Sequence, residues 1–328
     1  MKKHPDLLTV GTSWICESFL ESAAAAGFTH SAVYSRTQER ARAFAEKHGA
    51  KKIFTSLDDA AACPEIDCVY IASPNVFHFE QAKLFLAHKK HVIVEKPICT
   101  YPPQIEELYR LADENGVTVC EALMPQHVPA LAALREALPT IGRIRSAELD
   151  YSQLSSKYAG YLRGERQNIF DPAMQAGCLQ DLGVYAVAVA WLLFGTPAEV
   201  KASAVMLPEG ADAAFSAIFG YPDKTVTISS SKTAQTRVPS QILGDRGVIL
   251  IDSVSQLTGI KVLYNDGTSR GIAGVPTRFE VMRAEAEDFY AYINGGAPRI
   301  PYAEARETSL RVSRLMEKIR RDAGNYAF

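Results

Sequence analysis

The first 120 residues alternate short apolar runs with segments of helical periodicity, and no other feature of the sequence constrains the fold as strongly. This alternation is typical of parallel βαβ units, in which buried strands are joined by helices. We expect strands at 7–10, 31–34, 53–54, 68–72, 91–94 and 117–120, and helices at 14–26, 38–48, 77–88 and 102–115. Glycines suited to end a helix follow three of these helices, at Gly27, Gly49 and Gly116. The predicted fold is α/β, with a doubly wound parallel sheet that binds ligands at the carboxyl ends of its strands.

From residue 124 the pattern changes to alternating apolar and polar residues, as in antiparallel strands with one exposed face. We expect strands at 144–151 and at several places within 199–264, a polar irregular stretch at 152–175, and helices at 129–138, 179–194, 280–294 and 302–322. The sequence thus predicts two domains, a doubly wound domain at 1–123 and an α+β domain at 124–328 with a large, mostly antiparallel open sheet. The last helix is placed to pack back toward the first domain.

Composition excludes several classes of protein. The 328 residues have 22% charged side chains and a net charge of −2 without a basic stripe, so neither nucleic acid nor a membrane surface is an expected partner. No apolar window of about twenty residues predicts a membrane span. The six cysteines form no Cys-x-x-Cys pair, which predicts buried free thiols in a reducing cytoplasm. His78 and His127 fit no metal-ligand spacing, so no metal is expected.

A candidate phosphate-binding turn lies between the first predicted strand and the first predicted helix. Of the Gly-x-Gly-x-x-Gly fingerprint for dinucleotides, the sequence keeps the first glycine, Gly11, with the small residues Ser13 and Cys16 at the other two positions. Ser13 would cap the helix or donate to a phosphate oxygen. An ordinary strand–helix turn explains the same residues. The candidate cofactor contacts here are Gly11, Thr12, Ser13, Trp14 and Ile15.

Ser35 and Arg36 follow the second strand, where NAD-preferring sites place an acidic residue for the ribose hydroxyls. Arginine at this place can bind a 2′-phosphate and stack on the adenine, with Arg40 one turn later. This predicts a preference for NADP over NAD. The alternative is a solvated arginine at the start of a helix.

Two further motifs follow strands. Ser73, Pro74, Asn75 and His78 come after the fourth, and Glu95-Lys96-Pro97 comes directly after the fifth. A lysine at the mouth of a sheet is partly desolvated, which lowers its pKa and suits it to exchange a proton or to polarise a hydroxyl. The alternative is a surface turn. All of these residues are candidate cofactor contacts.

The Glu-Lys-Pro turn, together with the upstream Ser-Pro-Asn-x-x-His, resembles the glucose–fructose oxidoreductase/inositol dehydrogenase/MocA (Gfo/Idh/MocA) family. The likeness extends through 170–172, 177–185, 195–197 and 244–247. The resemblance implies a Rossmann domain and a second domain whose open sheet mediates a homodimer or homotetramer. It also implies hydride transfer between NAD(P) and a carbon of a sugar, cyclitol or diol, in a cleft between the domains.

By position, Lys96 matches the catalytic lysine of this family, and Asp181 and Tyr185 match its Asp-x-Gly-x-His/Tyr segment. Their spacing of four predicts one helical face. Tyrosine in place of histidine is similar to the dimeric dihydrodiol dehydrogenases. A tyrosine is a poor base at neutral pH unless a cation such as Lys96 stabilises its phenolate. The alternative is a buried, structural Tyr185.

The expected activity is that of an NAD(P)-dependent dehydrogenase or reductase acting on CH–OH groups of a small molecule. Two other functions stay open. A non-catalytic, dinucleotide-sensing regulator would need none of Lys96, Asp181 and Tyr185. An NAD-dependent glycosidase of the same family would release sugar without net oxidation.

Overall fold

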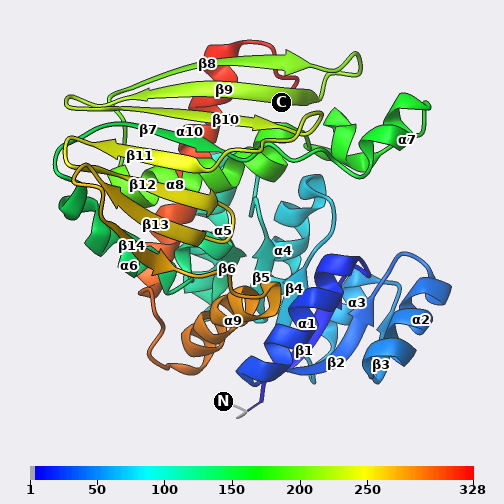
Figure 1. Cartoon of the computed structure of the whole chain (residues 1–328). Helices are drawn as coiled ribbons and strands as arrows, with labels where there is room; N and C mark the ends of the chain where they lie inside the picture. The colour runs from blue at the N-terminus through cyan, green and yellow to red at the C-terminus, as the bar shows by residue number, and fades with distance from the viewer. Residues whose placement is uncertain (1–3) are drawn as a thin grey trace. The chain divides into compact units, whose positions relative to one another are not determined.

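The computed structural model describes residues 4–328 and divides into two units (Figure 1). The first contains the chain up to Leu123 and the segment Thr277–Leu310, and the second contains Met124–Pro276 and Arg311–Phe328. The sequence pattern predicts that Thr277–Leu310 belongs to the second domain, whereas the structure groups it with the first. The difference arises because helix α9 (Arg278–Asn294) packs on helix α1 (Trp14–Ala26), through contacts that local periodicity does not reveal.

The first unit is built on a six-stranded parallel sheet of order β3-β2-β1-β4-β5-β6, which confirms the doubly wound prediction. Its strands are β1 (Asp6–Val10), β2 (Thr29–Tyr34), β3 (Lys52–Phe54), β4 (Cys68–Ile71), β5 (His91–Glu95) and β6 (Val119–Ala122). Its other helices are α2 (Gln38–His48), α3 (Leu57–Ala62), α4 (His78–Ala87) and α5 (Pro102–Asn115).

Local chemistry explains most of these boundaries. Gly27, Gly49 and Gly116 each adopt the left-handed conformation that ends a helix, as predicted. Helix α3 was not predicted, because its six residues are too few to show a period. Strand β6 extends past the predicted end to include Glu121, whose buried carboxyl interrupts the apolar run in the sequence.

The second unit is built on an eight-stranded sheet of order β14-β13-β12-β11-β7-β10-β9-β8. Its strands are β7 (Ile144–Asp150), β8 (Glu199–Met206), β9 (Asp212–Gly220), β10 (Thr225–Ser231), β11 (Ser240–Gly244), β12 (Gly247–Ser253), β13 (Thr258–Tyr264) and β14 (Ser269–Ala273). Only the pair β7–β10 is parallel among these described strands, so the prediction of a mostly antiparallel sheet is confirmed.

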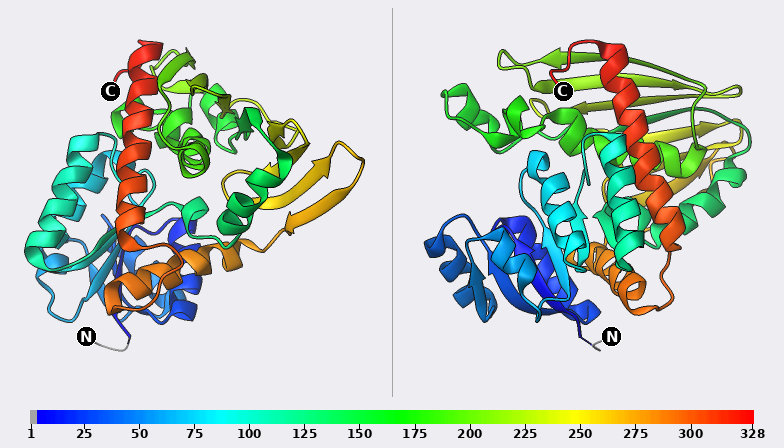
Figure 2. Two further views of the ribbon diagram at one scale, coloured as in Figure 1. Left: turned by 90° about the vertical axis from the view of Figure 1, so that its left-hand side faces the viewer. Right: turned by 180° about the vertical axis from the view of Figure 1, so that it is seen from behind.

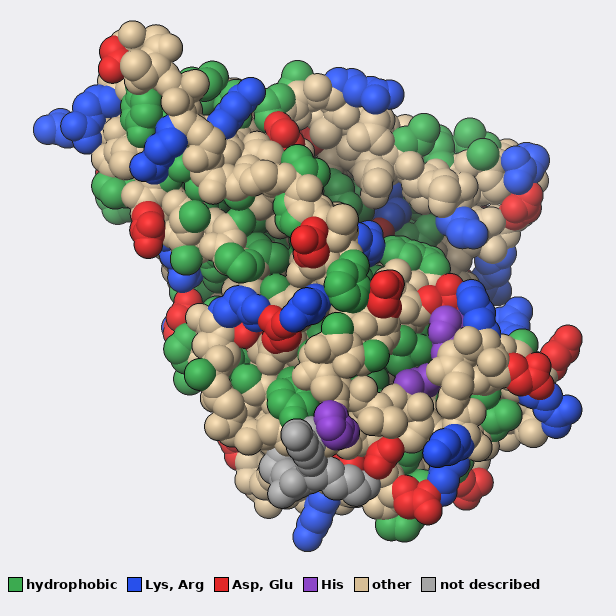
Figure 3. Space-filling view, turned by 60° about the horizontal axis from the view of Figure 1, so that its bottom comes forward, with side chains coloured by type: hydrophobic (Ala, Val, Ile, Leu, Met, Phe, Trp, Pro, Cys, Tyr) green, Lys and Arg blue, Asp and Glu red, His purple; other side chains and the backbone are tan. Residues whose placement is uncertain are grey.

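Helix α8 (Val184–Phe194) packs against β7 and β10 of this sheet (Figure 2). The unit also contains α6 (Ala130–Ala137), the short α7 (Tyr158–Leu162) and the end of α10 (Tyr302–Ala323). The helical stretch Pro172–Phe194 is long and apolar enough to cross a membrane by composition, but 78% of its most apolar 18-residue window is buried in the fold, as in a core helix. The other face of the sheet leaves Val205 and Ile218 exposed. On the face of the molecule in Figure 3, acidic and basic side chains are interspersed.

Candidate active site

Lys96 lies in a turn at the carboxyl end of β5, where the sequence predicts it. The strand ends at Glu95, and the Lys96–Pro97 peptide bond is cis. The half-buried Lys96 therefore occupies the edge at which a doubly wound sheet binds its ligands. Ser73 follows the neighbouring strand β4 at the same edge.

Three polar side chains hold the backbone of this turn. The fully buried His78 places its ring nitrogens 3.0 Å from the Pro97 carbonyl oxygen and 2.8 Å from that of Ser73. Glu121 accepts a hydrogen bond of 2.9 Å from the Ile98 N–H, and Glu95 accepts one of 3.2 Å from the Lys96 N–H. Burial lowers the pKa of His78. His78, predicted as a cofactor contact, therefore faces the backbone and fixes the turn.

Glu95 is the carboxyl nearest to Lys96 in the sequence, and its surroundings are unusual. Tyr70, which stacks on Phe19, donates a hydrogen bond to it. Burial raises the pKa of Glu95, while the positive charge of Lys96 and the bond from Tyr70 act in the opposite direction. Burial also raises the pKa of Glu121 on the next strand. Lys96 is thus a cation next to the half-buried Glu95 and near the buried Glu121, and its charge favours the ionised form of Glu95.

The backbone of the glycine turn suits only glycine at position 11. Gly11 has φ of +119°, and a Cβ atom there would lie 3.1 Å from the Ala72 carbonyl oxygen, so a side chain would be strained and crowded. Ser13 occupies the N-cap position of α1, but among residues 4–328 its hydroxyl caps no backbone N–H and lies 3.8 Å from the Cys16 sulfur. The first N–H groups of α1 therefore keep the capacity to bind a phosphate.

The other predicted cofactor residues are arranged as follows. Ser35 is buried and donates its N–H to the Phe54 carbonyl, while Arg36 and Arg40 are exposed. The Ser73 hydroxyl donates to Gln81, and Asn75 begins a 3-10 turn before α4. The exposed arginines are suitably placed after β2 to meet a phosphate group.

Asp181 and Tyr185 lie in the second unit, on a helix that begins irregularly. Leu179–Gly183 is a π-helical turn, in which the Val184 N–H bonds to the Leu179 carbonyl five residues back. The prediction that Asp181 and Tyr185 share one helical face assumed α-helical geometry. The π turn changes the angle around the helix axis between these two residues. π-helical turns are frequent at functional sites.

The structure adds Lys232 to this group. Its side chain is only 4% exposed and forms an ion pair with Asp181, whose side chain is 28% exposed. Tyr185 is buried, with its ring edge-on to that of Tyr151 at 5.7 Å. No motif in the sequence indicates Lys232. The alternation of buried and exposed residues along β10 does indicate it, because Lys232 lies on the same buried face as Val226 and Ile228.

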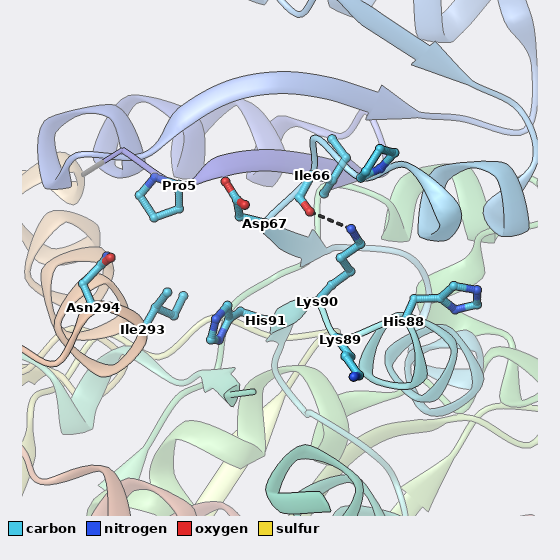
Figure 4. A pocket seen from close by; sticks show the side chains of 10 residues that line it. Pro5, Ile66, Asp67, His88, Lys89, Lys90, His91, Ile293 and Asn294 are labelled. Atoms are coloured by element: carbon cyan, nitrogen blue, oxygen red, sulfur yellow. Dashed lines mark hydrogen bonds between the residues drawn. The ribbon is translucent and has the colours of Figure 1, made fainter. Parts of the chain in front are cut away.

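A pocket of 310 Å³ in the first unit lies elsewhere (Figure 4). It lies beside Asp67 and His91, at the amino ends of β4 and β5, away from Lys96. The Lys90 ammonium beside it donates to the Ile66 and Cys63 carbonyl oxygens, at 2.8 and 2.7 Å. Lys90 therefore binds backbone carbonyl groups, whereas Lys96 lies at the opposite, carboxyl end of the strands.

Most of the chain matches known protein families. Residues 7–123 match a family described as oxidoreductase family, NAD-binding Rossmann fold, and residues 133–250 match the GFO/IDH/MocA C-terminal domain. The chain is 38% identical to a scyllo-inositol 2-dehydrogenase (NADP(+)) of Bacillus subtilis, over 96% of each chain. It is 24% identical to a trans-1,2-dihydrobenzene-1,2-diol dehydrogenase of Danio rerio, over 89% of this chain and 88% of that one. A 3-ketoreductase of Actinomadura kijaniata, solved with NADP, has a TM-score of 0.85 at 22% identity, covering 97% and 98% of the two chains.

Proposed function

Because this chain belongs to the Gfo/Idh/MocA family of NAD(P)-dependent oxidoreductases, we propose that it interconverts a secondary alcohol and a carbonyl in a cyclitol, sugar or trans-diol. The observation that carries the proposal is the Lys96 turn, a lysine held by buried contacts at the ligand-binding edge of the sheet. A cyclitol is the first substrate class to test, because the relative at 38% identity is named as an inositol dehydrogenase.

The glycine turn and the edge of the sheet would hold the cofactor. Gly11, Thr12, Ser13, Trp14 and Ile15 would surround its diphosphate, and Ser73, Pro74, Asn75 and Glu95 would line the nicotinamide side. We propose NADP as the preferred cofactor, with the exposed Arg36 and Arg40 binding the 2′-phosphate. When bound, the nicotinamide supplies the hydride acceptor or donor.

Side chains of the protein would transfer the proton of the reacting hydroxyl group. Lys96 would hydrogen-bond the reacting oxygen and exchange its proton, with Tyr185 as its partner in that exchange. Asp181 would orient them and hold local charge. Lys232 would hold the Asp181 carboxylate in place through their ion pair.

Partners and location complete the proposal. Val205 and Ile218 on the open sheet face would pack against another copy in a homodimer or homotetramer. A cytoplasmic location agrees with six buried cysteines that form no disulfide.

The test is a screen for cofactor reduction. The purified protein is incubated with NADP or NAD and a panel of inositols, sugars and trans-diols, and the absorbance of reduced nicotinamide is followed. We expect NADP-dependent oxidation of an inositol. Binding of NADP without oxidation of any panel member would favour a dinucleotide-sensing regulator. Release of sugar from an aryl glycoside without added cofactor would favour the glycosidase.

A further inference from the structure

An exposed tryptophan and an exposed arginine form a pair beside the glycine turn. Trp14 is the first residue of α1 and is 61% exposed, although large aromatic side chains normally bury most of their surface. The Arg278 guanidinium carbon lies 4.6 Å from the centre of the Trp14 ring. This distance is that of a cation–π contact, so the charge is held over the ring.

The fold positions Arg278 firmly although it is far from Trp14 in the sequence. Arg278 begins α9, and Thr277 and Glu280 form a capping box that fixes this helix start. Helix α9 is anchored on α1, because Ser22 donates to the Phe279 carbonyl and the Phe19 and Phe289 rings lie 6.5 Å apart. Figure 1 shows the two helices side by side.

The acidic residues near this pair have other partners. Glu17, one turn into α1, is paired with Lys47 at 2.7 Å and with His48 at 3.4 Å. Glu280 accepts its hydrogen bonds from Thr277. The charge of Arg278 also acts on Glu95, at the end of β5. The guanidinium therefore lies within electrostatic reach of both the glycine turn and the Lys96 turn.

We propose that Arg278, held over Trp14, is a cofactor-binding residue that contacts the diphosphate of the dinucleotide at the glycine turn. The proposal rests on the proposed function and adds a residue that no motif indicates. A diphosphate brings two negative charges to the start of α1, where the helix N–H groups already favour an anion. Arginine adds two parallel hydrogen bonds of fixed geometry, and the tryptophan ring limits the conformations of its side chain.

Affinity measurements separate this role from that of Arg36. Calorimetric titration of Arg278→Ala should show about tenfold weaker binding of NADP and of NAD, by the same factor, because both contain the diphosphate. Binding of ADP should weaken, while 2′-AMP, which has no diphosphate, should bind as to wild type. Arg36→Ala is the matched control and should weaken NADP and 2′-AMP but not NAD. Arg278→Lys should recover part of the affinity.

Fluorescence gives a second readout. The chain has two tryptophans, Trp14 and Trp191, and the second lies in the other unit, stacked with Arg311. Titration with NADPH should quench tryptophan emission and transfer energy to the nicotinamide. Trp14→Phe should lose most of this signal, and Trp191→Phe should keep it.

The outcomes are distinct. If wild type binds NADP and Arg278→Ala binds it equally well, Arg278 is a surface residue that packs on Trp14, and this inference is wrong while the proposed function stands. If wild type binds neither dinucleotide, the proposed function and this inference both fail. The control is the unfolding temperature of Arg278→Ala. If it equals that of wild type, a loss of affinity does not come from a loss of the fold.

Discussion

The two parts of the candidate site are held in different ways. The Lys96 turn is fixed through its backbone, since His78, Glu95 and Glu121 bind its N–H and C=O groups. The Asp181 turn departs from α-helical geometry. Asp212 accepts a hydrogen bond of 2.8 Å from the Leu179 N–H at its start, and Asp181 itself forms an ion pair with Lys232. In the first region these contacts are made with the backbone on either side of the functional side chain. In the second the side chain itself is held, so the same substitution strategy should produce different losses in the two regions.

The largest expected effect tests whether the Lys96 side chain is catalytic. Lys96→Ala should lower kcat by roughly 10²–10⁴-fold, the usual contribution of an acid–base group, while the affinity for NADP changes little. Steady-state kinetics on a substrate from the screen measures the first quantity, and calorimetric titration measures the second. Lys51→Ala, at an exposed lysine before β3, is the control and should leave kcat unchanged. Turnover of Lys96→Ala equal to wild type would remove Lys96 from the mechanism.

The ion pair is tested by removing one partner. Lys232→Met leaves Asp181 without its cation in a partly buried site, which should lower the free energy of unfolding by about 1–3 kcal/mol, less than for a fully buried pair because Asp181 is 28% exposed. Asp181→Asn should lower the free energy of unfolding by less in the Lys232→Met background than in wild type, because the ion pair is already absent there. Urea unfolding of the four proteins measures the coupling. Simple additivity would show that the pair does not hold the turn.

The backbone contacts are tested at Glu121, where a matched pair of variants exists. Glu121→Gln keeps an oxygen acceptor for the Ile98 N–H, whereas Glu121→Ala leaves that buried donor unpaired at a cost of about 1–3 kcal/mol. The alanine variant should also lower kcat more than it raises KM for the cofactor, and the glutamine variant should recover kcat. Equal kcat in both variants would mean that the turn does not depend on this contact.

The smallest effect concerns the pH dependence of stability near the Lys96 turn. Burial raises the pKa of Glu285 well above its usual range, and the charges of Glu95, Glu121 and Asp288 act in the same direction. The folded state then binds more protons, so the free energy of unfolding decreases as pH rises above about 4.3, the ordinary value for glutamate. In Glu285→Gln the free energy of unfolding should therefore decrease less between pH 5 and 8 than in wild type. Thermal unfolding at several pH values measures this difference.

The control for this measurement is Glu287. Although its partial burial acts to raise its pKa, its hydrogen bonds to Arg299 and Arg283 leave that pKa lowered. Its ionised form therefore stabilises the fold, a contribution present above the ordinary glutamate pKa and lost as pH falls through the lowered value. Glu287→Gln should reduce stability at neutral pH. The same pH profile for both variants would contradict the assigned roles.

Local signals in the sequence predict much of this molecule. The bounds of α1, α2 and α5 agree with the pattern of apolar residues and capping glycines, and the Lys96 turn lies where the motif after β5 places it. What local signals miss depends on contacts far apart in the chain. The pairing of Lys232 with Asp181 and the return of α9 to the first unit are of this kind, and the π turn depends on packing rather than composition.

The return of α9 has a consequence for how the protein is made. The first unit lacks α9, and with it the Phe289 ring next to Phe19, until the ribosome has synthesised the whole second sheet. Domains generally fold in the order of their synthesis. Here the first unit begins first but is completed only after the whole second sheet, so the packing of α1 against α9 forms late in translation.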